Sequence, residues 1–260
     1  MTSLPFFQVD AFAADAPLTG NPAAVMPLER WLDDAQMQAI AAENNLSETA
    51  FTVPSERDDA DYDLRWFTST IEVDLCGHAS LATGHVLVTG QPLRFATRSG
   101  ILTVTRRDDL VELDVPAFKA RPGDLPGLHE ALGASGPTFL HDGGSASAIV
   151  ELADEAAVRA VRADFAKLRR IDRLVIVTAP GESQDIASRV FAAAYGIDED
   201  SVTGAAHAAL VPFWAERLGR NAFTALQASR RSGILHCRLE GDRVVLGGRC
   251  QTVIVGQFQL

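Results

Sequence analysis

The sequence predicts an α+β protein made of two pseudo-symmetric domains. One motif, Ser-Gly-Ile-Leu, stands at Ser99–Leu102 and again at Ser232–Leu235, an offset of 133 positions. A second motif, Asp-x3-Arg-x-Phe, begins at Asp61 and again at Asp185. Short alternating strand patterns surround two helix patterns of small and apolar residues. Repeats of this length indicate a duplicated supersecondary unit, and each half contains both strands and helices.

The repeat divides the chain into a first domain, residues 1–117, and a second domain, residues 118–260. The segment 120–127 contains two prolines and two glycines and is a plausible linker between them. A chain of 260 residues is long enough for two domains, each with a core of its own. We expect the last strand to be able to pack on the first domain.

Composition and charge exclude several classes of partner. Hydrophobic residues make up 47% of the chain and charged residues 22%, which is ordinary for a globular protein. The net charge of −11 argues against duplex nucleic acid and against anionic membrane surfaces. No apolar run reaches about 18 residues, so no spanning helix is expected. The three cysteines form no CxxC motif, which indicates reduced thiols and a cytoplasmic protein.

The elements of the first half follow from periodicity and turn residues. Phe7, Val9 and Ala11 alternate with polar residues and predict a strand. Asp33, with Gln36 three residues later, predicts a capping box at the start of a helix. The remaining strands are expected at 49–53 and 62–67, with a hairpin at 101–106 and 110–115.

Two helix patterns differ from ordinary surface helices. Residues 77–88 and 204–218 are small or apolar nearly all round at their starts, which predicts buried helices. A hairpin at 234–239 and 244–246 follows the second. A buried helix start leaves its first N–H groups without water, and a bound anion is one solution. We expect the duplicated helices to aim these ends at one cleft between the domains, where amides of Gly77, Gly204 and Ala205 would hold a carboxylate.

Glu48 and His78 are candidates for acid–base chemistry. Glu48 precedes a strand whose core face carries Thr49, Phe51 and Val53, so alternation directs it to the other face, either into a cleft as an acid–base group or onto the surface. His78 is the second residue of the first buried helix. The positive helix end disfavours imidazolium, which predicts a neutral ring that either shuttles a proton or is satisfied by backbone.

Asp200 and Cys76 lie just before the two buried helices. Asp200 is either a turn or N-cap carboxylate or an acid that orients the substrate. Cys76 precedes Gly77, and a thiol at a helix start is expected to have a lowered pKa. A two-thiol racemase is not expected, because Thr203 stands at the matching place in the second half. The sequence contains no metal-ligand cluster, phosphate loop or dinucleotide fingerprint, so no metal and no cofactor are expected.

The sequence resembles the PhzF-like (phenazine biosynthesis-like) isomerase family along essentially its whole length. The segments that carry the resemblance are Phe6–Phe12, Gly20–Val25, Glu43–Phe51, Asp74–Ala79, Glu199–Gly204 and Gln227–Arg231. It departs from the family at Ala205, where serine often follows the second-half Thr-Gly. It also has Ser201 and Ser69 where proline is common. Ala205 removes a hydroxyl donor and leaves only a backbone N–H.

The resemblance implies the diaminopimelate-epimerase-type fold. That fold has two similar domains, each a curved, mostly antiparallel sheet wrapped round a central helix. The family's acid–base glutamate falls on Glu48, its substrate-contacting histidine on His78 and its aspartate on Asp200.

The expected function is a cofactor-independent isomerase that shifts a proton on a small carboxylate-bearing substrate, with Glu48 as acid and base. A homodimer is expected, because Trp214 and the phenylalanines could form a dimer face. Two alternatives stay open. One is a non-catalytic binding protein of the same fold, for which Ala205 is the argument. The other is an amino-acid racemase or epimerase using Cys76 and Asp200.

Overall fold

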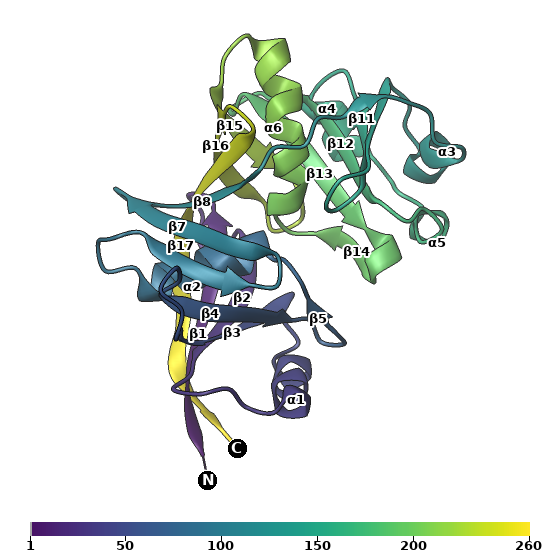
Figure 1. The fold of residues 1–260 in the computed structure, drawn as a ribbon. Helices are drawn as coiled ribbons and strands as arrows, with labels where there is room; N and C mark the ends of the chain where they lie inside the picture. The colour runs from purple at the N-terminus through teal and green to yellow at the C-terminus, as the bar shows by residue number, and fades with distance from the viewer. Residues whose placement is uncertain (1) are drawn as a thin grey trace. The chain divides into compact units, whose positions relative to one another are not determined.

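The computed structural model describes residues 2–260 and consists of two compact units (Figure 1). Unit 1 contains residues 2–114 and 247–260, and unit 2 contains residues 115–246. The segment 247–260 therefore belongs to the first unit, as the expectation for the last strand allowed, although the boundaries 118–260 counted it with the second domain. The reason is strand pairing, because this segment runs antiparallel along the first strand of the chain from Ser3 to Ala13.

Unit 1 is a closed barrel of eight strands (Figure 1). Each strand pairs with the next in this order, and the last pairs with both the first and the one before it. The strands are β1 (Ser3–Ala13), β2 (Asn21–Pro27), β3 (Glu48–Pro54), β4 (Tyr62–Phe67), β6 (Leu93–Thr97), β7 (Gly100–Arg107), β8 (Leu110–Pro116) and β17 (Arg243–Gln259). The two-residue strand β5 (Glu72–Val73) extends the sheet beside β4.

The helix α2 (Gly77–Leu87) packs against β1, β2, β3 and β7, and its residues 78–84 are buried. Close packing requires small side chains on it. A Cβ at Gly84 would lie 2.3 Å from Cγ1 of Val104, so glycine is needed at this contact. The helix that the sequence predicted to be buried is therefore the central helix of unit 1.

The helix α1 (Asp34–Asn44) covers the opposite face of β3. Met37 and Ile40 pack there with Phe51 and Val53. The strand β3 is thus buried on both faces, with Phe51 and Val53 toward α1 and the alternate positions toward α2. The predicted capping box at Asp33 is wrong, because Asp33 is the N-cap but its side chain makes no hydrogen bond to the helix.

Unit 2 repeats this plan with additional short helices. Its strands are β9 (Arg121–Pro122), β10 (Thr138–His141), β11 (Ser147–Glu151), β12 (Leu174–Pro180), β13 (Ile186–Ala192), β14 (Ile197–Asp200), β15 (Ala222–Gln227), β16 (Gly233–Glu240) and the start of β17. The central helix is α6 (Gly204–Leu218), which ends at Gly219 as expected. The helices α3 (Leu128–Leu132), α4 (Glu155–Ala160), α5 (Phe165–Leu168) and η1 (Ala193–Tyr195) share a separate apolar core with β11, β12 and β13.

The duplication is visible in the strand pairing. The pairs β2–β3 and β11–β12 are parallel, β3–β4 and β12–β13 are antiparallel, and β4–β6 and β13–β15 are again parallel. The repeated motif has the same role twice, because Arg65 binds Glu72 through two hydrogen bonds and Arg189 binds Glu199 in the same way. The predicted pair of pseudo-symmetric α+β units is confirmed.

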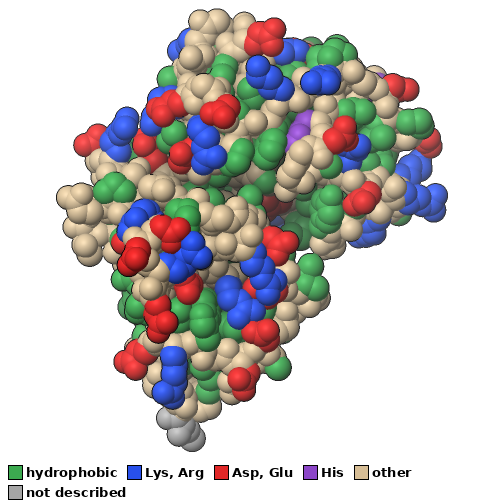
Figure 2. Space-filling model, in the orientation of Figure 1, with side chains coloured by type: hydrophobic (Ala, Val, Ile, Leu, Met, Phe, Trp, Pro, Cys, Tyr) green, Lys and Arg blue, Asp and Glu red, His purple; other side chains and the backbone are tan. Residues whose placement is uncertain are grey.

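The structure bears on two further expectations, the dimer face at Trp214 and the membrane-spanning helix. Trp214 is buried in unit 2 and its Nε1 donates to Oγ1 of Thr178 at 3.0 Å, so the predicted part for Trp214 in a dimer face is wrong. Among residues 2–260, no helix combines the length and the apolar character that crossing a bilayer requires. Figure 2 shows basic side chains interspersed with acidic ones on the visible face, although the net charge of the chain is −11.

Candidate active site

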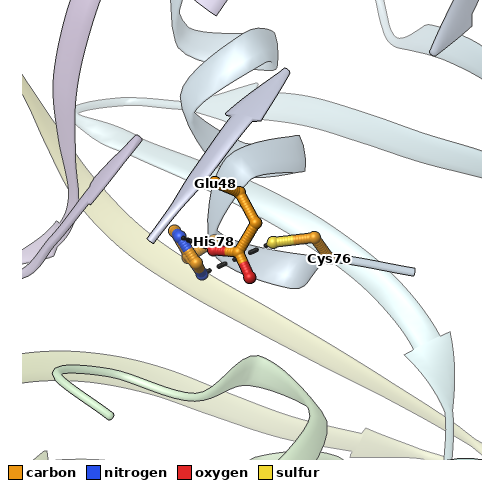
Figure 3. A group of neighbouring side chains, drawn as sticks. All are labelled: Glu48, Cys76 and His78. Carbon is orange, nitrogen blue, oxygen red and sulfur yellow. Dashed lines mark hydrogen bonds and ion pairs between the residues drawn. The ribbon is translucent and has the colours of Figure 1, made fainter. Parts of the chain in front are cut away.

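Glu48 is the first residue of β3 and points toward the start of α2 (Figure 3). Its backbone is opposite Ala23 of β2, so it lies on the face of β3 that carries Ala50 and looks into the barrel. The side chain is 12% exposed, and its Oε2 lies 3.0 Å from Nε2 of His78. The sequence-based expectation that alternation turns Glu48 away from Phe51 and Val53 matches this orientation.

His78 is the second residue of α2, and its side chain is 6% exposed. The contact with Glu48 is short enough for an ion pair. However, neither Nε2 of His78 nor Oε2 of Glu48 has a hydrogen bond of good geometry within the described part of the chain. Buried polar atoms are nearly always hydrogen-bonded in proteins, and exceptions concentrate at functional sites. The two atoms therefore form a close contact that lacks the geometry of a good hydrogen bond.

The electrostatic environment of His78 favours its charged form. Burial alone would lower the pKa of the imidazole, but the Sγ of Cys76 and the carboxylate of Glu48 outweigh burial and raise the pKa well above its ordinary value of 6.5. The prediction of a neutral ring, made from the helix end alone, is therefore wrong.

Cys76 is the N-cap of α2, and its Sγ lies 3.5 Å from Nδ1 of His78 (Figure 3). Burial, together with the negative charge of Glu48, raises the pKa of this thiol. The expected lowering at a helix start is thus wrong, because burial opposes the thiolate more strongly than the helix end supports it. Cys76 and Glu48 thus contact the ring of His78 from two sides, Sγ at Nδ1 and the carboxylate at Nε2.

These three side chains are also a conceivable donor set for a cation, since one ligand atom from each lies within 4.8 Å of the others. Metal ligation requires a thiolate and a neutral imidazole. The raised pKa values of Cys76 and His78 oppose both of these forms. We therefore interpret the cluster as an acid–base group.

The beginning of α2 offers amides to an anion. The N-cap side chain makes no hydrogen bond to the helix, and the first intrahelical bond runs from the N–H of Ser80 to the carbonyl of Cys76 at 3.2 Å. The amides of Gly77 and His78 precede that bond and lie at the positive end of the helix dipole, while the amide of Ala79 interacts with the sulfur of Cys76.

The predicted residues of unit 2 gather at the beginning of α6. The hydroxyl of Thr203 donates to Oδ2 of Asp200 at 2.6 Å. As in α2, the N-cap side chain, here that of Thr203, makes no hydrogen bond to the helix that Gly204 and Ala205 begin. The predicted site residues thus form two groups, one at each central helix. That both groups face one cleft stays a prediction.

Sequence reasoning missed Gln227, which organises this helix start. Its Oε1 accepts from the amide of Thr203 at 2.9 Å, and its Nε2 donates to the carbonyl of Asp200 at 2.9 Å. Gln227 is fully buried at the end of β15. The sequence does show one sign of this role, because Gln227 is the polar last residue of a mainly apolar strand.

A pocket of about 520 Å³ in unit 2 was also not anticipated. It is lined by Glu199, Ser201, Ser229, Arg230 and Arg231, which flank Asp200 and the turn after β15. Glu199 is bound to Arg189 through two hydrogen bonds. A larger cavity of about 640 Å³, beside Phe213 and Arg217, contains none of the predicted site residues.

His207 is a buried titratable residue that the sequence analysis did not single out. Its Nδ1 donates to the carbonyl of Thr203 at 2.8 Å, as the hydroxyl of Ser80 donates to the carbonyl of Cys76 in the other unit. Burial lowers the pKa of His207 to about 4. The ring therefore stays neutral at physiological pH and is a structural counterpart of Ser80.

This neutral histidine predicts a pH dependence of stability. The unfolded chain binds a proton at this ring below about pH 6.5, whereas the folded chain binds it only near pH 4. The free energy of unfolding should therefore fall as the pH drops through this window, by about 3 kcal/mol in total from this residue. Urea titrations of the wild type and His207→Phe at several pH values check it. Equal slopes against pH in the two proteins would contradict the assignment.

Comparison with known proteins identifies the family of the chain. The model of the phenazine biosynthesis-like protein family matches residues 9–256. An uncharacterized isomerase of Pseudomonas aeruginosa is 48% identical, with 99% of each chain covered. The crystal structure of a phenazine biosynthesis protein of the PhzF family from Enterococcus faecalis is 42% identical, with a TM-score of 0.92 and 100% of both chains covered.

More distant structures share the fold. A hydroxyproline epimerase from Agrobacterium vitis, 12% identical, has a TM-score of 0.64 over 98% of this chain and 92% of its own. Together with the barrel around α2, this gives the diaminopimelate-epimerase-like fold that the resemblance implied. The chain belongs to the phenazine biosynthesis-like family of isomerases.

Proposed function

We propose that the protein is a cofactor-independent isomerase that shifts a proton on a small carboxylate-bearing substrate, with Glu48 as both acid and base. The observation that carries the proposal is the Glu48–His78 pair. It consists of a carboxylate and an imidazole 3.0 Å apart, both largely buried, with the facing atoms lacking a well-formed hydrogen bond. Acid and base for a proton shift are therefore supplied by the chain itself.

The proposed reaction has two proton transfers. Glu48 takes a proton from a carbon next to a carboxylate or a conjugated system, and the electron pair of the C–H bond moves into that system. The N–H of His78 and the amides at the start of α2 stabilise the resulting anion. Glu48 then returns the proton to another carbon of the conjugated system, so that no atom is gained or lost.

We further propose that Asp200 orients the substrate and that the amides of Gly204 and Ala205 hold its anionic part. Two hydrogen bonds support a fixed position for Asp200, one from the hydroxyl of Thr203 to its carboxylate and one from Nε2 of Gln227 to its carbonyl. Asp200→Asn should raise KM and lower kcat/KM by about tenfold to a hundredfold, since one charged contact is worth about 1.5–3 kcal/mol. Steady-state kinetics on an identified substrate measure this, and an unchanged kcat/KM would remove Asp200 from the role.

The test of the proposal uses hydrogen exchange with solvent. A panel of cyclic unsaturated carboxylates and α-amino carboxylates is incubated with the protein in deuterated water, and mass spectrometry follows deuterium uptake at carbon. Catalysed uptake into at least one class supports an isomerase. Tight binding of panel members with no uptake into any would favour the non-catalytic alternative, for which the missing hydroxyl at Ala205 is the argument. The racemase alternative fits less well, because the thiol of Cys76 has a raised pKa.

We also propose a cytoplasmic homodimer. The free cysteines Cys76, Cys237 and Cys250 fit a reducing compartment. Exposed apolar side chains on β17, namely Val253, Ile254 and Val255, support a dimer face in place of Trp214. Size-exclusion chromatography with light scattering measures the mass in solution. A monomer at micromolar concentration would contradict the dimer.

A further inference from the structure

The last part of β17 has a free edge. On one side this strand pairs with β1 over residues 249–259, down to the two chain ends in Figure 1. On the other side β8 lies beside the beginning of β17. The N–H of Ala117, after β8, donates to the carbonyl of Asp242, before β17, and Asp109, before β8, binds Arg249. β8 therefore reaches no further along β17 than Arg249, and no other strand of the described chain continues on this side.

This edge lacks most of the features that keep sheet edges from pairing. Charged side chains, proline and bulges are the usual ones. Residues 250–260 contain no charged side chain and no proline, and residues 2–9 of the neighbouring strand carry no charge either. A bulge is present at Val253, where the register with β1 shifts by one residue. It leaves Ile254 to Gln259 as regular strand with an open, uncharged edge.

An apolar groove of about 250 Å³ lies beside this edge, between α1 and the end of β17. Phe258 pairs with Leu4 of β1, and both side chains pack against the cluster that α1 covers. Ile254 lies four residues before Phe258, so strand alternation puts it on the same face, where it is 46% exposed. The groove is lined by Gln36, Ala39, Ile40, Glu43, Phe258 and Leu260.

We propose that a second copy of this chain pairs with the free edge of β17, antiparallel and centred on Gly256, so that the two barrels share one continuous sheet. This inference rests on the proposed homodimer and names its interface. Pairing centred on Gly256 places Ile254 of each copy opposite Phe258 of the other. Opposed residues of antiparallel strands lie on the same face, so each Ile254 fills the groove beside Phe258 of the other copy.

Charge favours a second copy as the occupant of this edge. The net charge of −11 makes two copies repel each other over most approaches, but the uncharged edge brings no like charges side by side. A two-fold pair also uses the anchor twice, because the same surface contributes from both copies. A strand from another protein would gain one anchor at most. Gly256, at the two-fold axis, has no side chain that would separate the strands.

Lysine at Ile254 should separate the two copies. Each copy loses an apolar anchor and gains an ammonium group at the groove, so the dissociation constant of the dimer should rise by at least about a hundredfold. Ile101→Lys is the matched control, since Ile101 is 38% exposed on β7 of the same unit and lies outside this edge. Sedimentation velocity over a range of protein concentrations measures the constants, and circular dichroism checks that the variants are folded.

The outcomes separate the interface from the dimer itself. Dissociation of Ile254→Lys no stronger than that of the wild type or of Ile101→Lys overturns this interface and leaves the homodimer in place. A monomeric wild type overturns both. Neither result depends on the proposed isomerase activity, because no substrate is used.

A disulfide at the axis gives a second, direct readout. A Cβ at Gly256 meets no atom within 4 Å in one copy, so the chain accommodates a side chain there. Opposed residues of an antiparallel pair have Cα atoms about 4.5–5.5 Å apart, which is within disulfide range. Mild oxidation should therefore produce a covalent dimer of Gly256→Cys, but not of Ile101→Cys or of the wild type with its own cysteines. Absence of that dimer overturns the inference, even if Ile254→Lys does not fold.

Discussion

Replacing Glu48 with glutamine should lower the rate of solvent exchange at the substrate carbon by about 10³-fold, within the range of 10²–10⁴ that a positioned general base contributes. Glutamine has nearly the same shape as glutamate and keeps the barrel packing, but its amide cannot take a proton from carbon. The loss should therefore appear in kcat, with a smaller change in KM. Deuterium uptake followed by mass spectrometry measures the rate.

The same variant has a second expected effect, which needs no substrate. Without the carboxylate, one of the two groups that raise the pKa of His78, the other being Cys76, is lost while burial continues to lower that pKa. The pKa of the ring should therefore fall in Glu48→Gln. Glu43→Gln is the matched control, since Glu43 is exposed on α1 and should change neither rate nor pKa. Exchange at the wild-type rate in Glu48→Gln would remove this residue from the mechanism.

The stability linked to His78 has a definite sign. A ring whose folded pKa is raised contributes stability that is fully present below about pH 6.5 and is lost as the pH rises through the folded value. His207 acts in the opposite sense, because its lowered pKa destabilises the fold as the pH drops from about 6.5 toward 4. The resting fold is thus most stable between these two titrations, with one charged and one neutral buried histidine.

The fold could be predicted to a large extent because its signals are local or repeated. Period-two alternation located β3 and oriented Glu48, and small apolar residues identified α2 and α6 as buried helices. The repeat beginning at Asp61 and Asp185 fixed the duplication. The sequence analysis allowed the last strand to pack on the first domain but did not identify its partner, because nothing within 247–260 shows that it pairs with β1.

The electrostatics of the site could not be predicted because they depend on residues far apart in the chain. The helix end argued for a neutral His78, but Glu48, thirty positions earlier, outweighs it once β3 and α2 are packed. The same burial reverses the expected pKa of Cys76. Asn21 and Gln227 are each one polar residue beside an apolar strand, and only the tertiary structure shows which helix start each one serves, Asn21 through a contact of 3.3 Å from its Nδ2 to Nδ1 of His78.

Gly20→Ala should have the largest effect on stability, about 4 kcal/mol, because two costs combine at the entrance to β2. Gly20 has φ +81°, which costs a residue with a Cβ about 1–3 kcal/mol. Its Cβ would also lie 2.4 Å from the carbonyl oxygen of Ala11, a backbone atom that cannot move aside cheaply.

Gly127→Ala separates the two costs, since Gly127 has the same φ of +81° but nothing within 4 Å of its Cβ position. It should lose only the first cost, about 1–3 kcal/mol. Thermal unfolding measures both variants, at about 2–4 °C per kcal/mol for domains of 150–250 residues. Because Gly20 immediately precedes Asn21, the displaced strand start should also disturb the ring of His78 in any Gly20→Ala protein that folds. A loss of stability no greater than that of Gly127→Ala would show that β1 and β2 can separate at this point, and that the position of Asn21 does not depend on their close approach.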